Sequence, residues 1–581
     1  MKRTTYILFL LLLLFLSSCS QRPRELASGL YRANIGYNDL SLLEEKITEL
    51  GGEIVTQAVE LKQLEVEFLS REARAQAIQK LKILPYTRFV ESANSRSIFP
   101  PIVQVSSIKV EGPGWHQENL HLAQAWEKLK GKDTIVAISD SFIDMSHPDL
   151  KGRFVTGYDA KEGKEIPTNS NLEVADHGTH VAGIVAAVGS AEGIAPETKL
   201  MPIRIFAPEY AGDVSVAKAL VWAVDHGADI INMSWGGPIY SISLAEALNY
   251  ALSKNVILVA AAGNEGISSI SYPAAHPGVI AVGATNPYGN LTWFSNYGRY
   301  VRVGAPGNRI FSSLPNSDYA FWDGTSMATP VVSGIAALLR EENKDIDSYQ
   351  VLSRLMAGGQ SHERWTAVDA FGTVEAKTGE KAACLKLIVQ ESDKTGARLA
   401  DIYLRHKKSN WRYWLKADTS GRAEFWGLKP GLYEISVAGP ETPKIDPEDR
   451  VVVQKELELS SECTFSEIVE LKTAFKLSMT WQSDDLDLAI KEGNWNWISS
   501  KDGAKFGSFS EDMQDGGEEN YSFGGGISET PLKFGVYNRS DKEIKAKLRI
   551  IENGHERNLE ITVPVTKDEP FEVDEIYVLG N

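Results

Sequence analysis

Three short segments that lie far apart in this chain each carry one side chain suited to nucleophilic catalysis. The segment AISDS contains Asp140, the segment HGTHVAG begins with His177, and the segment GTSMATP contains Ser326. A serine hydroxyl is a weak nucleophile until a neighbouring base removes its proton, and an imidazole oriented by a carboxylate is such a base. An acid, a histidine and a serine therefore predict a charge-stabilised nucleophilic serine.

Each of these side chains is predicted to lie at the end of a secondary-structure element. Asp140 follows an apolar strand at residues 134–138, whereas His177 and Ser326 each open a helix with an apolar face. A hydroxyl at a helix N-terminus gains from the helix dipole, and its own backbone N–H can face a developing oxyanion. His180, the second histidine of its segment, points elsewhere and is expected to be structural.

The order and spacing of these segments resemble the subtilisin-like serine peptidases (peptidase S8 family). The resemblance implies that Ser326 is the nucleophile, His177 the base and Asp140 its orienting acid. It implies that Asn264, in the segment AAGNEG, donates to the oxyanion; losing that donor costs about 10²–10³ in rate in subtilisin itself. It also implies residues that pair with an extended peptide and line its specificity pocket: Ser234, Trp235, Gly236, Ala261, Ala262 and Gly263.

Two features depart from the family pattern. Phe142 stands where the family usually has glycine, and a ring at that turn would crowd the floor of the site and shift Asp140 or reshape the pocket. The loop that follows the His177 helix is short, so the calcium-binding insertion of many relatives is missing. Asp149 matches one family calcium ligand, but its partner loop is absent. We assign no metal ligand and expect no cofactor in the chemistry; a structural calcium ion is allowed but not placed.

The first residues predict a targeting segment. Lys2 and Arg3 precede an apolar run at residues 6–16, which is too short to span a bilayer. The segment LSSC that follows resembles the bacterial lipobox, which implies a signal peptide at residues 1–18 and a lipid on Cys19. We therefore expect a lipid-anchored protein of the bacterial cell envelope. An ordinary secretory signal with an incidental cysteine is the alternative.

The chain of 581 residues is too long for one hydrophobic core, so several domains are predicted. Residues 19–101 have the pattern strand, helix, strand, strand, helix, strand. This small α+β unit resembles the inhibitor-I9-like propeptides of the family, which implies an intramolecular inhibitor cut off between about residues 97 and 112. Residues 102–378 alternate strands and helices, so the fold class is α/β with a parallel sheet covered on both faces.

Two all-β sandwich domains are predicted to follow. Residues 379–468 resemble carboxypeptidase-regulatory or Cna-B-type sandwiches, and residues 469–581 resemble jelly-roll-like C-terminal domains. Cys384 and Cys463 flank the first of them. An oxidising envelope favours a disulfide between the two, and two free buried thiols are the alternative. Acid clusters in the last domain could bind calcium or could be solvated turn residues.

Composition limits the partners of the protein. A formal net charge of −17 argues against nucleic acid, whose phosphates need a basic surface. The sequence thus predicts a secreted or envelope-anchored serine endopeptidase that cleaves polypeptides, is made as an autoinhibited precursor, and leaves its membrane anchor once the propeptide is cut. The alternative is a scaffold or binding protein with a weak or inactive peptidase fold, which Phe142 and the appended sandwiches favour.

Overall fold

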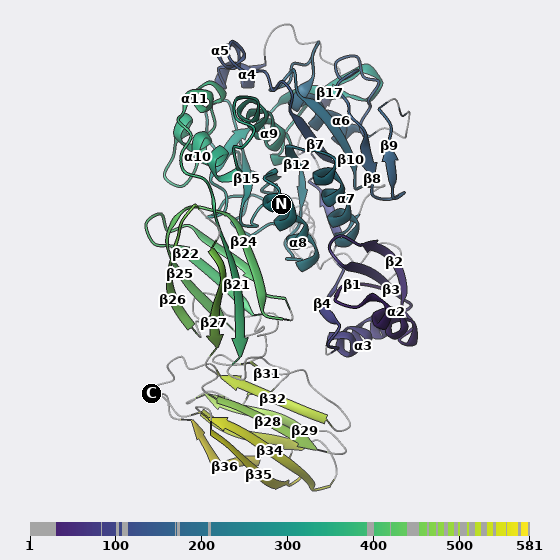
Figure 1. Ribbon diagram of the computed structural model, residues 1–581, viewed down its shortest axis with the longest axis vertical. Helices are drawn as coiled ribbons and strands as arrows, with labels where there is room; N and C mark the ends of the chain where they lie inside the picture. The colour runs from purple at the N-terminus through teal and green to yellow at the C-terminus, as the bar shows by residue number, and fades with distance from the viewer. Residues whose placement is uncertain are drawn as a thin grey trace, which may run out of the picture.

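The computed structural model arranges the chain as a series of modules (Figure 1). It describes residues 31–82, 84–93, 95–99, 101, 104–106, 114–168, 170, 175–206, 211–391, 400–418, 420–438, 453–461, 464–471, 475–481, 486–492, 498–499, 508–509, 517–523, 532–538, 542–552, 555–566 and 571–578. The predicted lipid attachment at Cys19 lies outside these residues. Within them, no helix is long and apolar enough to cross a membrane.

The first module has the predicted order of strand, helix, strand, strand, helix, strand. Its sheet has the order β2-β3-β1-β4, and one face carries both helices over a small apolar core. Asp39 caps the first helix by accepting from the backbone N–H of Ser41 and Leu42, as an N-cap aspartate should. The elements are β1 (Tyr31–Tyr37), α2 (Leu40–Glu49), β2 (Glu53–Ala58), β3 (Gln63–Phe68), α3 (Arg71–Lys82) and β4 (Thr87–Ser92).

The second module confirms the predicted α/β class. Its ten-stranded sheet has the order β19-β20-β16-β15-β14-β12-β7-β10-β8-β9, parallel except for the antiparallel edge pairs β19·β20 and β8·β9. The strands are β7 (Ile135–Asp140), β8 (Gly157–Asp159), β9 (Lys164–Ile166), β10 (Lys199–Arg204), β12 (Ile230–Met233), β14 (Ile257–Ala261), β15 (Val279–Thr285), β16 (Val303–Pro306), β19 (Gln360–Ser361) and β20 (Thr366–Ala367).

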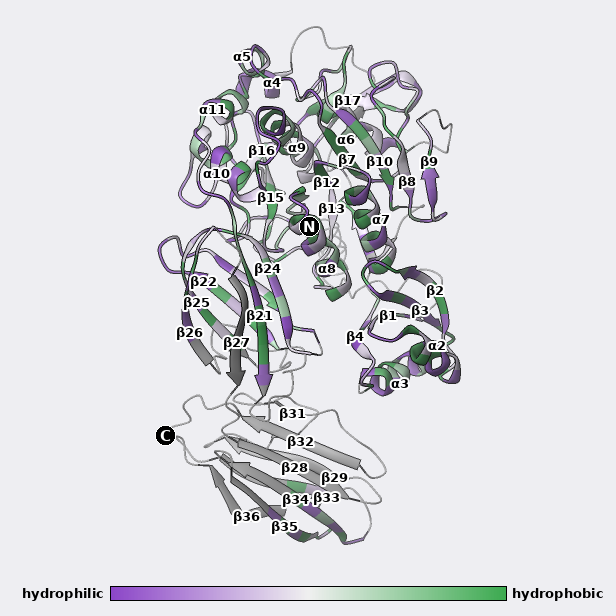
Figure 2. Cartoon of the chain, in the orientation of Figure 1, coloured by the Kyte–Doolittle hydropathy of each residue, from purple (hydrophilic) through white to green (hydrophobic). Residues whose placement is uncertain are grey.

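Helices cover both faces of this sheet because its strands are apolar on both sides. Residues of α6 (Asp176–Ala186), α9 (Thr325–Glu342) and α10 (Ser348–Gly358) share one core with alternate strand residues. Those of α7 (Asp213–Asp225) and α8 (Ile242–Ser253) share the other. Helix α7 mixes hydrophobic and hydrophilic residues in Figure 2, as a surface helix should. The shorter helices are α4 (Trp115–Asn119), α5 (Leu122–Trp126), η1 (Pro315–Ser317) and α11 (Ala370–Glu375).

Two small antiparallel sheets beside the main one join segments that are far apart in the sequence. Strand β5 (Ser95–Ile98) lies between β11 (Ala211–Gly212) and β13 (Trp235–Gly236). Strand β6 (Gln104–Ser106) pairs with the hairpin of β17 (Ile310–Leu314) and β18 (Asp318–Trp322). The first of these sheets connects the N-terminal module to the second module.

The C-terminal part of the chain forms two pairs of sheets. The first pair has the orders β24-β21-β27 and β23-β22-β25-β26, and the second has β31-β32-β28-β34-β35 and β30-β29-β33-β36. The strands of the first are β21 (Ala383–Glu391), β22 (Asp401–His406), β23 (Arg412–Lys416), β24 (Arg422–Leu428), β25 (Gly431–Ala438), β26 (Val453–Leu459) and β27 (Thr464–Leu471). The strands of the second are β28 (Phe475–Trp481), β29 (Leu486–Glu492), β30 (Ile498–Ser499), β31 (Ser508–Phe509), β32 (Gly517–Phe523), β33 (Leu532–Asn538), β34 (Ile544–Glu552), β35 (His555–Val563) and β36 (Phe571–Val578).

The cysteine prediction is met in part. Cys384 is disulfide-bonded. Its neighbour Leu385 pairs with Thr464, the residue that follows Cys463 in the sequence. Cys463 itself lies outside the described residues, so its pairing with Cys384 stays a prediction.

Candidate active site

Asp140 and His177 lie in contact at the C-terminal edge of the main sheet. Asp140 is the last residue of β7 and is fully buried, and His177 is the second residue of α6. The Asp140 Oδ1 atom lies 2.8 Å from Nδ1 of His177 and also accepts from the backbone N–H of Ser141 at 2.7 Å. A carboxylate held in this way fixes the imidazole tautomer that leaves Nε2 free to accept a proton.

Ser326 is the second residue of α9, but its hydroxyl is not bonded to His177. The Ser326 Oγ atom donates to carbonyl oxygens, that of Ser234 at 3.0 Å and that of Phe99 at 3.2 Å. His177 Nε2 and Asp140 Oδ2 are buried, and neither has a hydrogen-bond partner in the described part of the chain. The expected hydrogen bond between Ser326 and His177 is therefore absent from this state among the described residues, in which the Ser326 hydroxyl meets backbone carbonyls, that of Phe99 included.

The backbone of Phe99 belongs to the N-terminal module. Strand β5 pairs antiparallel with β11 on one side and β13 on the other, with Arg96 opposite Ala211 and Ile98 opposite Trp235. This register leads the next residue, Phe99, to the nucleophile. The segment 95–99 thus lies in the cleft as an extended peptide substrate would.

The predicted oxyanion donor is oriented by its neighbours. The side-chain oxygen of Asn264 accepts from the backbone N–H of Thr325 at 2.9 Å and from the Thr325 hydroxyl at 2.8 Å. This fixes the amide so that its NH₂ group faces Gly324, next to Ser326. Ser326 lies in the first turn of α9, where backbone N–H groups lack a carbonyl partner one turn earlier. Two donors of this kind can stabilise a developing oxyanion.

The predicted substrate-binding residues divide by role. Ser234 is tied to the nucleophile helix, because its hydroxyl accepts from Asn232 at 3.0 Å and donates to the carbonyl of Ser326 at 3.0 Å. Trp235 pairs with Ile98 of β5 through its backbone, but its indole does not line the specificity pocket as expected. The indole N–H donates to the Ser139 carbonyl at 2.9 Å and the ring is fully buried in the core, where its large apolar surface is better accommodated.

Gly236 faces the ring of Phe99. A Cβ built on Gly236 would lie 2.9 Å from Cζ of that ring, and the Ser271 hydroxyl and Tyr272 carbonyl are equally near. Phe99 is 7% exposed, so its ring occupies an enclosed pocket. A larger side chain at position 236 would close that pocket to an aromatic ring.

The other predicted lining residues follow β14. Ala261 ends that strand, and both Ala261 and Ala262 are buried. The N–H of Gly263 donates to the Thr325 hydroxyl at 3.2 Å, and the carbonyl of Ala262 accepts from Asn296 at 3.1 Å. These bonds hold the segment that presents Asn264.

Phe142 does not disturb the site in the way the sequence suggested. It is not among the residues with positive φ, so its turn needs no glycine. Its ring is 3% exposed and belongs to the core that α6 and α9 share. The contact between Asp140 and His177 is intact beside it.

His180 and Asp149 have structural positions. His180 stacks on Trp322 with ring centroids 4.5 Å apart, and its Nε2 lies 3.1 Å from the Ala320 carbonyl. Burial lowers the pKa of His180 to about 3, so it stays neutral. The Asp149 carboxylate accepts from the N–H of Ala191 at 2.8 Å and closes the short loop. No group of three potential metal ligands occurs in the described part of the chain.

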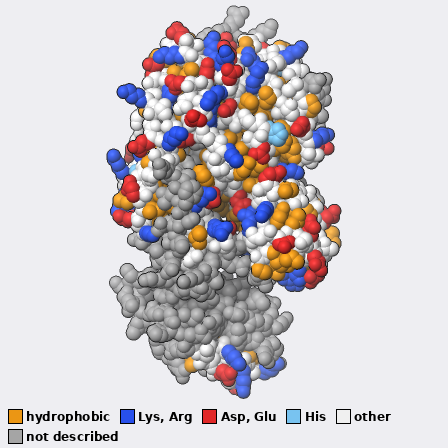
Figure 3. All heavy atoms as spheres, viewed as in Figure 1, with side chains coloured by type: hydrophobic (Ala, Val, Ile, Leu, Met, Phe, Trp, Pro, Cys, Tyr) orange, Lys and Arg blue, Asp and Glu red, His pale blue; other side chains and the backbone are white. Residues whose placement is uncertain are grey.

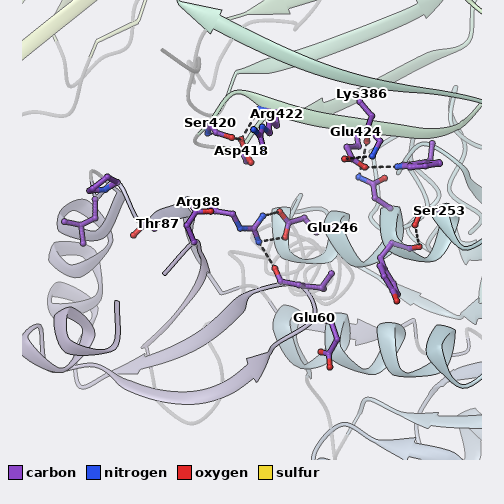
Figure 4. A pocket seen from close by; sticks show the side chains of 17 residues that line it. Glu60, Thr87, Arg88, Glu246, Ser253, Lys386, Asp418, Ser420, Arg422 and Glu424 are labelled. Carbon is purple, nitrogen blue, oxygen red and sulfur yellow. Dashed lines mark hydrogen bonds and ion pairs between the residues drawn. The ribbon is translucent and has the colours of Figure 1, made fainter. Parts of the chain in front are cut away.

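The N-terminal module also attaches through charged groups to the second module, which carries Asp140, His177 and Ser326 (the catalytic module). Glu91 accepts from the backbone N–H of Ile242 at 3.0 Å and from the Ser241 hydroxyl at 2.9 Å, and so caps α8. Burial raises the pKa of Glu91, and the negative charge of Asp213 acts in the same direction. Arg88 forms a salt bridge with Glu246 of α8, shown in Figure 4 beside a cavity of about 810 Å³ that the first sandwich also lines.

Sequence reasoning missed several functional residues. Phe99, Arg96 and Glu91 act through pairings with segments more than 100 residues away, and no local pattern marks them. Thr325 had a signal, since it stands beside Ser326 in the motif GTSMATP. Its role became clear only from the bonds to Asn264.

Comparison with known proteins gives consistent results. Residues 131–373 match the family model of the subtilases. Fervidolysin of Fervidobacterium pennivorans is 30% identical over 486 residues, which cover 72% of this chain and 69% of the relative. Thermitase of Thermoactinomyces vulgaris is 39% identical over 232 residues, which cover 39% of this chain and 82% of the relative.

Two solved structures share the fold. The crystal structure of fervidolysin, described as a keratinolytic enzyme related to subtilisin, matches with a TM-score of 0.68 at 23% identity and covers 96% of both chains. The epidermin leader peptide processing serine protease of Staphylococcus aureus matches with a TM-score of 0.53 at 22% identity, over 60% of this chain and 99% of that one.

Proposed function

This chain belongs to the subtilase family of serine endopeptidases, and we propose that it hydrolyses peptide bonds through Asp140, His177 and Ser326. The observation that carries the proposal is the meeting of three groups: the Asp140–His177 contact of 2.8 Å, the Ser326 hydroxyl, and a peptide carbonyl 3.2 Å from it. The position of Phe142 in the core removes the main argument for an inactive scaffold.

The proposed reaction runs through an acyl-enzyme. His177 Nε2 takes the proton of the Ser326 hydroxyl while Oγ attacks the carbonyl carbon, and Asp140 stabilises the imidazolium. The Asn264 amide and the Ser326 N–H stabilise the oxyanion. His177 then protonates the leaving nitrogen as the C–N bond breaks. A water molecule repeats the sequence on the ester and frees Ser326.

The casein assay tests the proposal. Purified, processed protein should hydrolyse casein, and the Ser326→Ala variant should lose this activity because no hydroxyl remains to attack. Ser253→Ala, an exposed serine at the end of α8, serves as the control and should behave like the parent. Casein hydrolysis that survives in Ser326→Ala would refute the assignment.

We further propose that residues 19–101 inhibit the precursor. Support comes from the position of β5 between β11 and β13, from the Phe99 carbonyl at Ser326, and from Glu91 at the N-terminus of α8. A strand that occupies the cleft excludes other peptides. The slow, non-local fold of the catalytic module also makes a folding role for this segment reasonable.

The peptide bond that follows Phe99, whose carbonyl lies at Ser326, joins it to Pro100. A proline on the leaving side changes how this bond can be cleaved. Proline disfavours helical geometry in the preceding residue and so favours the extended form that the cleft binds. Its nitrogen carries a ring carbon instead of hydrogen, which crowds the approach of the His177 proton. We expect Pro100→Ala to speed cleavage after Phe99 by roughly 10- to 100-fold, a fraction of what a well-placed general acid contributes.

A time course of precursor loss, with N-terminal sequencing of the product, measures this effect. Pro101→Ala is the matched control, because it leaves the bond after Phe99 unchanged. A Pro100→Ala precursor that is processed at the parent rate, with the same new N-terminus as the parent, would contradict the expectation.

We propose a cell-envelope location from the sequence alone. The basic start, the apolar run and Cys19 are the support. If the lipid is on the propeptide segment, processing frees the catalytic module. Cell fractionation, followed by blotting for the C-terminal domain, tests whether processing releases the catalytic module from the membrane. Mature protein that stays in the membrane fraction would refute that release.

A further inference from the structure

The segment in the cleft identifies which side chain meets which part of the site. Phe99 presents its carbonyl to Ser326, so Arg96 is the fourth residue before the bond at the nucleophile. Arg96 is 1% exposed, and its guanidinium points into the catalytic module. We propose that Asp213 forms a subsite that selects a basic residue, arginine above all, at this position of a substrate. The inference rests on the proposed function and names its substrate class.

The subsite is built from one carboxylate and one carbonyl. Arg96 Nε donates to Asp213 Oδ1 at 2.7 Å, and Nη1 donates to the Ile239 carbonyl at 2.9 Å. Asp213 is fully buried, and its second oxygen Oδ2 has no hydrogen-bond partner among the described residues. A guanidinium carries several N–H donors in one plane, so two of its nitrogens donate to these acceptors at once.

Asp213 belongs to the catalytic module and remains when the propeptide leaves. It is the first residue of α7, where the helix dipole favours a negative charge. Its present neighbours Glu65 and Glu91 belong to the propeptide; burial raises the pKa of both, and the negative charge of Asp213 acts in the same direction. When the propeptide leaves, both carboxylates and Arg96 leave together. Of the three described acids in this cluster, Asp213 alone stays on the catalytic module.

A peptide that binds between β11 and β13 covers Asp213 as β5 does here, and a covered carboxylate without a cation is costly, so a substrate that brings a cation is favoured. A substrate with an apolar residue at this position would bury its side chain against an unpaired charge. Figure 3 shows acidic and basic groups interspersed over the described part of the face that it draws. The charge that contacts the Arg96 guanidinium is that of Asp213.

A pair of peptides tests the subsite. Full-length protein is left to process itself, and its active sites are counted by titration with a fluorophosphonate. The first peptide contains Arg-Ser-Ile-Phe-Ala-Ser, which copies residues 96–99 and replaces the prolines that follow. The second has citrulline, a neutral isostere, in place of arginine. The parent should cleave the arginine peptide after Phe with a kcat/KM at least about 10-fold higher.

Two variants assign that preference to Asp213. In Asp213→Asn the ratio of the two kcat/KM values should fall towards one, whereas Asp213→Glu keeps the charge and should keep a preference for arginine. The comparison of peptides in the parent does not depend on the folding of any variant. Equal kcat/KM values in the parent would overturn the subsite while leaving the peptidase function intact. Hydrolysis of neither peptide by the processed parent would refute both.

Discussion

Replacing His177 with alanine is expected to lower kcat by about 10⁶-fold, a magnitude that comes from subtilisin itself. His177 is the group in contact with Asp140, and its Nε2 is buried and has no hydrogen-bond partner within the described ranges. Without it, no base removes the Ser326 proton and no acid reaches the leaving nitrogen. The precursor should accumulate uncut, and peptide hydrolysis should fall below detection.

The matched control for this variant is His226→Ala. His226 lies exposed at the end of α7, stacked on Trp222. That variant should process itself and cleave peptides at the parent rate. Gel time courses and peptide hydrolysis measure both variants. Self-processing of His177→Ala at a rate within 10-fold of the parent would exclude His177 as the base.

Asp140→Asn is expected to lower the rate by about 10⁴-fold, the size of the loss for the equivalent substitution in trypsin. Asparagine preserves the shape of the buried residue. Its amide can donate to Nδ1 of His177, which stabilises the tautomer whose Nε2 carries a proton and cannot accept one from serine. The time that processing takes should lengthen by the same factor of about 10⁴.

The exposed Asp345 provides the control for a loss of negative charge. Asp345→Asn should process at the parent rate. Circular dichroism of Asp140→Asn should match that of the parent, since the substitution changes no volume in the core. A loss of rate below 10-fold in a folded Asp140→Asn protein would show that the 2.8 Å contact does not orient the base.

The sequence predicted the elements that depend on local patterns. The apolar run before Asp140 forms β7, and the apolar faces that follow His177 and Ser326 form α6 and α9. Alternating strands and helices gave the parallel sheet, because buried parallel strands are apolar on both faces.

The sequence could not predict how the cleft is filled. The pairing of β5 with β11 and β13 joins segments more than 100 residues apart, and its register depends on tertiary contacts such as Arg96 with Asp213. The predicted contact between Ser326 and His177 does not form as a hydrogen bond in this state, since the Ser326 hydroxyl donates to the Phe99 carbonyl.

Two side chains lie in other surroundings than the sequence motifs predicted. The indole of Trp235 was expected in the specificity pocket, but it lies in the core with its N–H on the Ser139 carbonyl. Phe142 was expected to strain a turn, but the core accommodates its ring without positive φ. In both cases packing against distant residues decided the position, which a single sequence does not show.

The most direct test of the account is the identity of the residue that a fluorophosphonate labels. Processed protein is treated with the probe, digested, and the modified peptide is sequenced by mass spectrometry. One adduct is expected, on Ser326, and the uncut His177→Ala precursor treated in the same way should carry none. Processed parent protein that takes no label, or takes it on a different serine while Ser326 stays unmodified, would contradict the account.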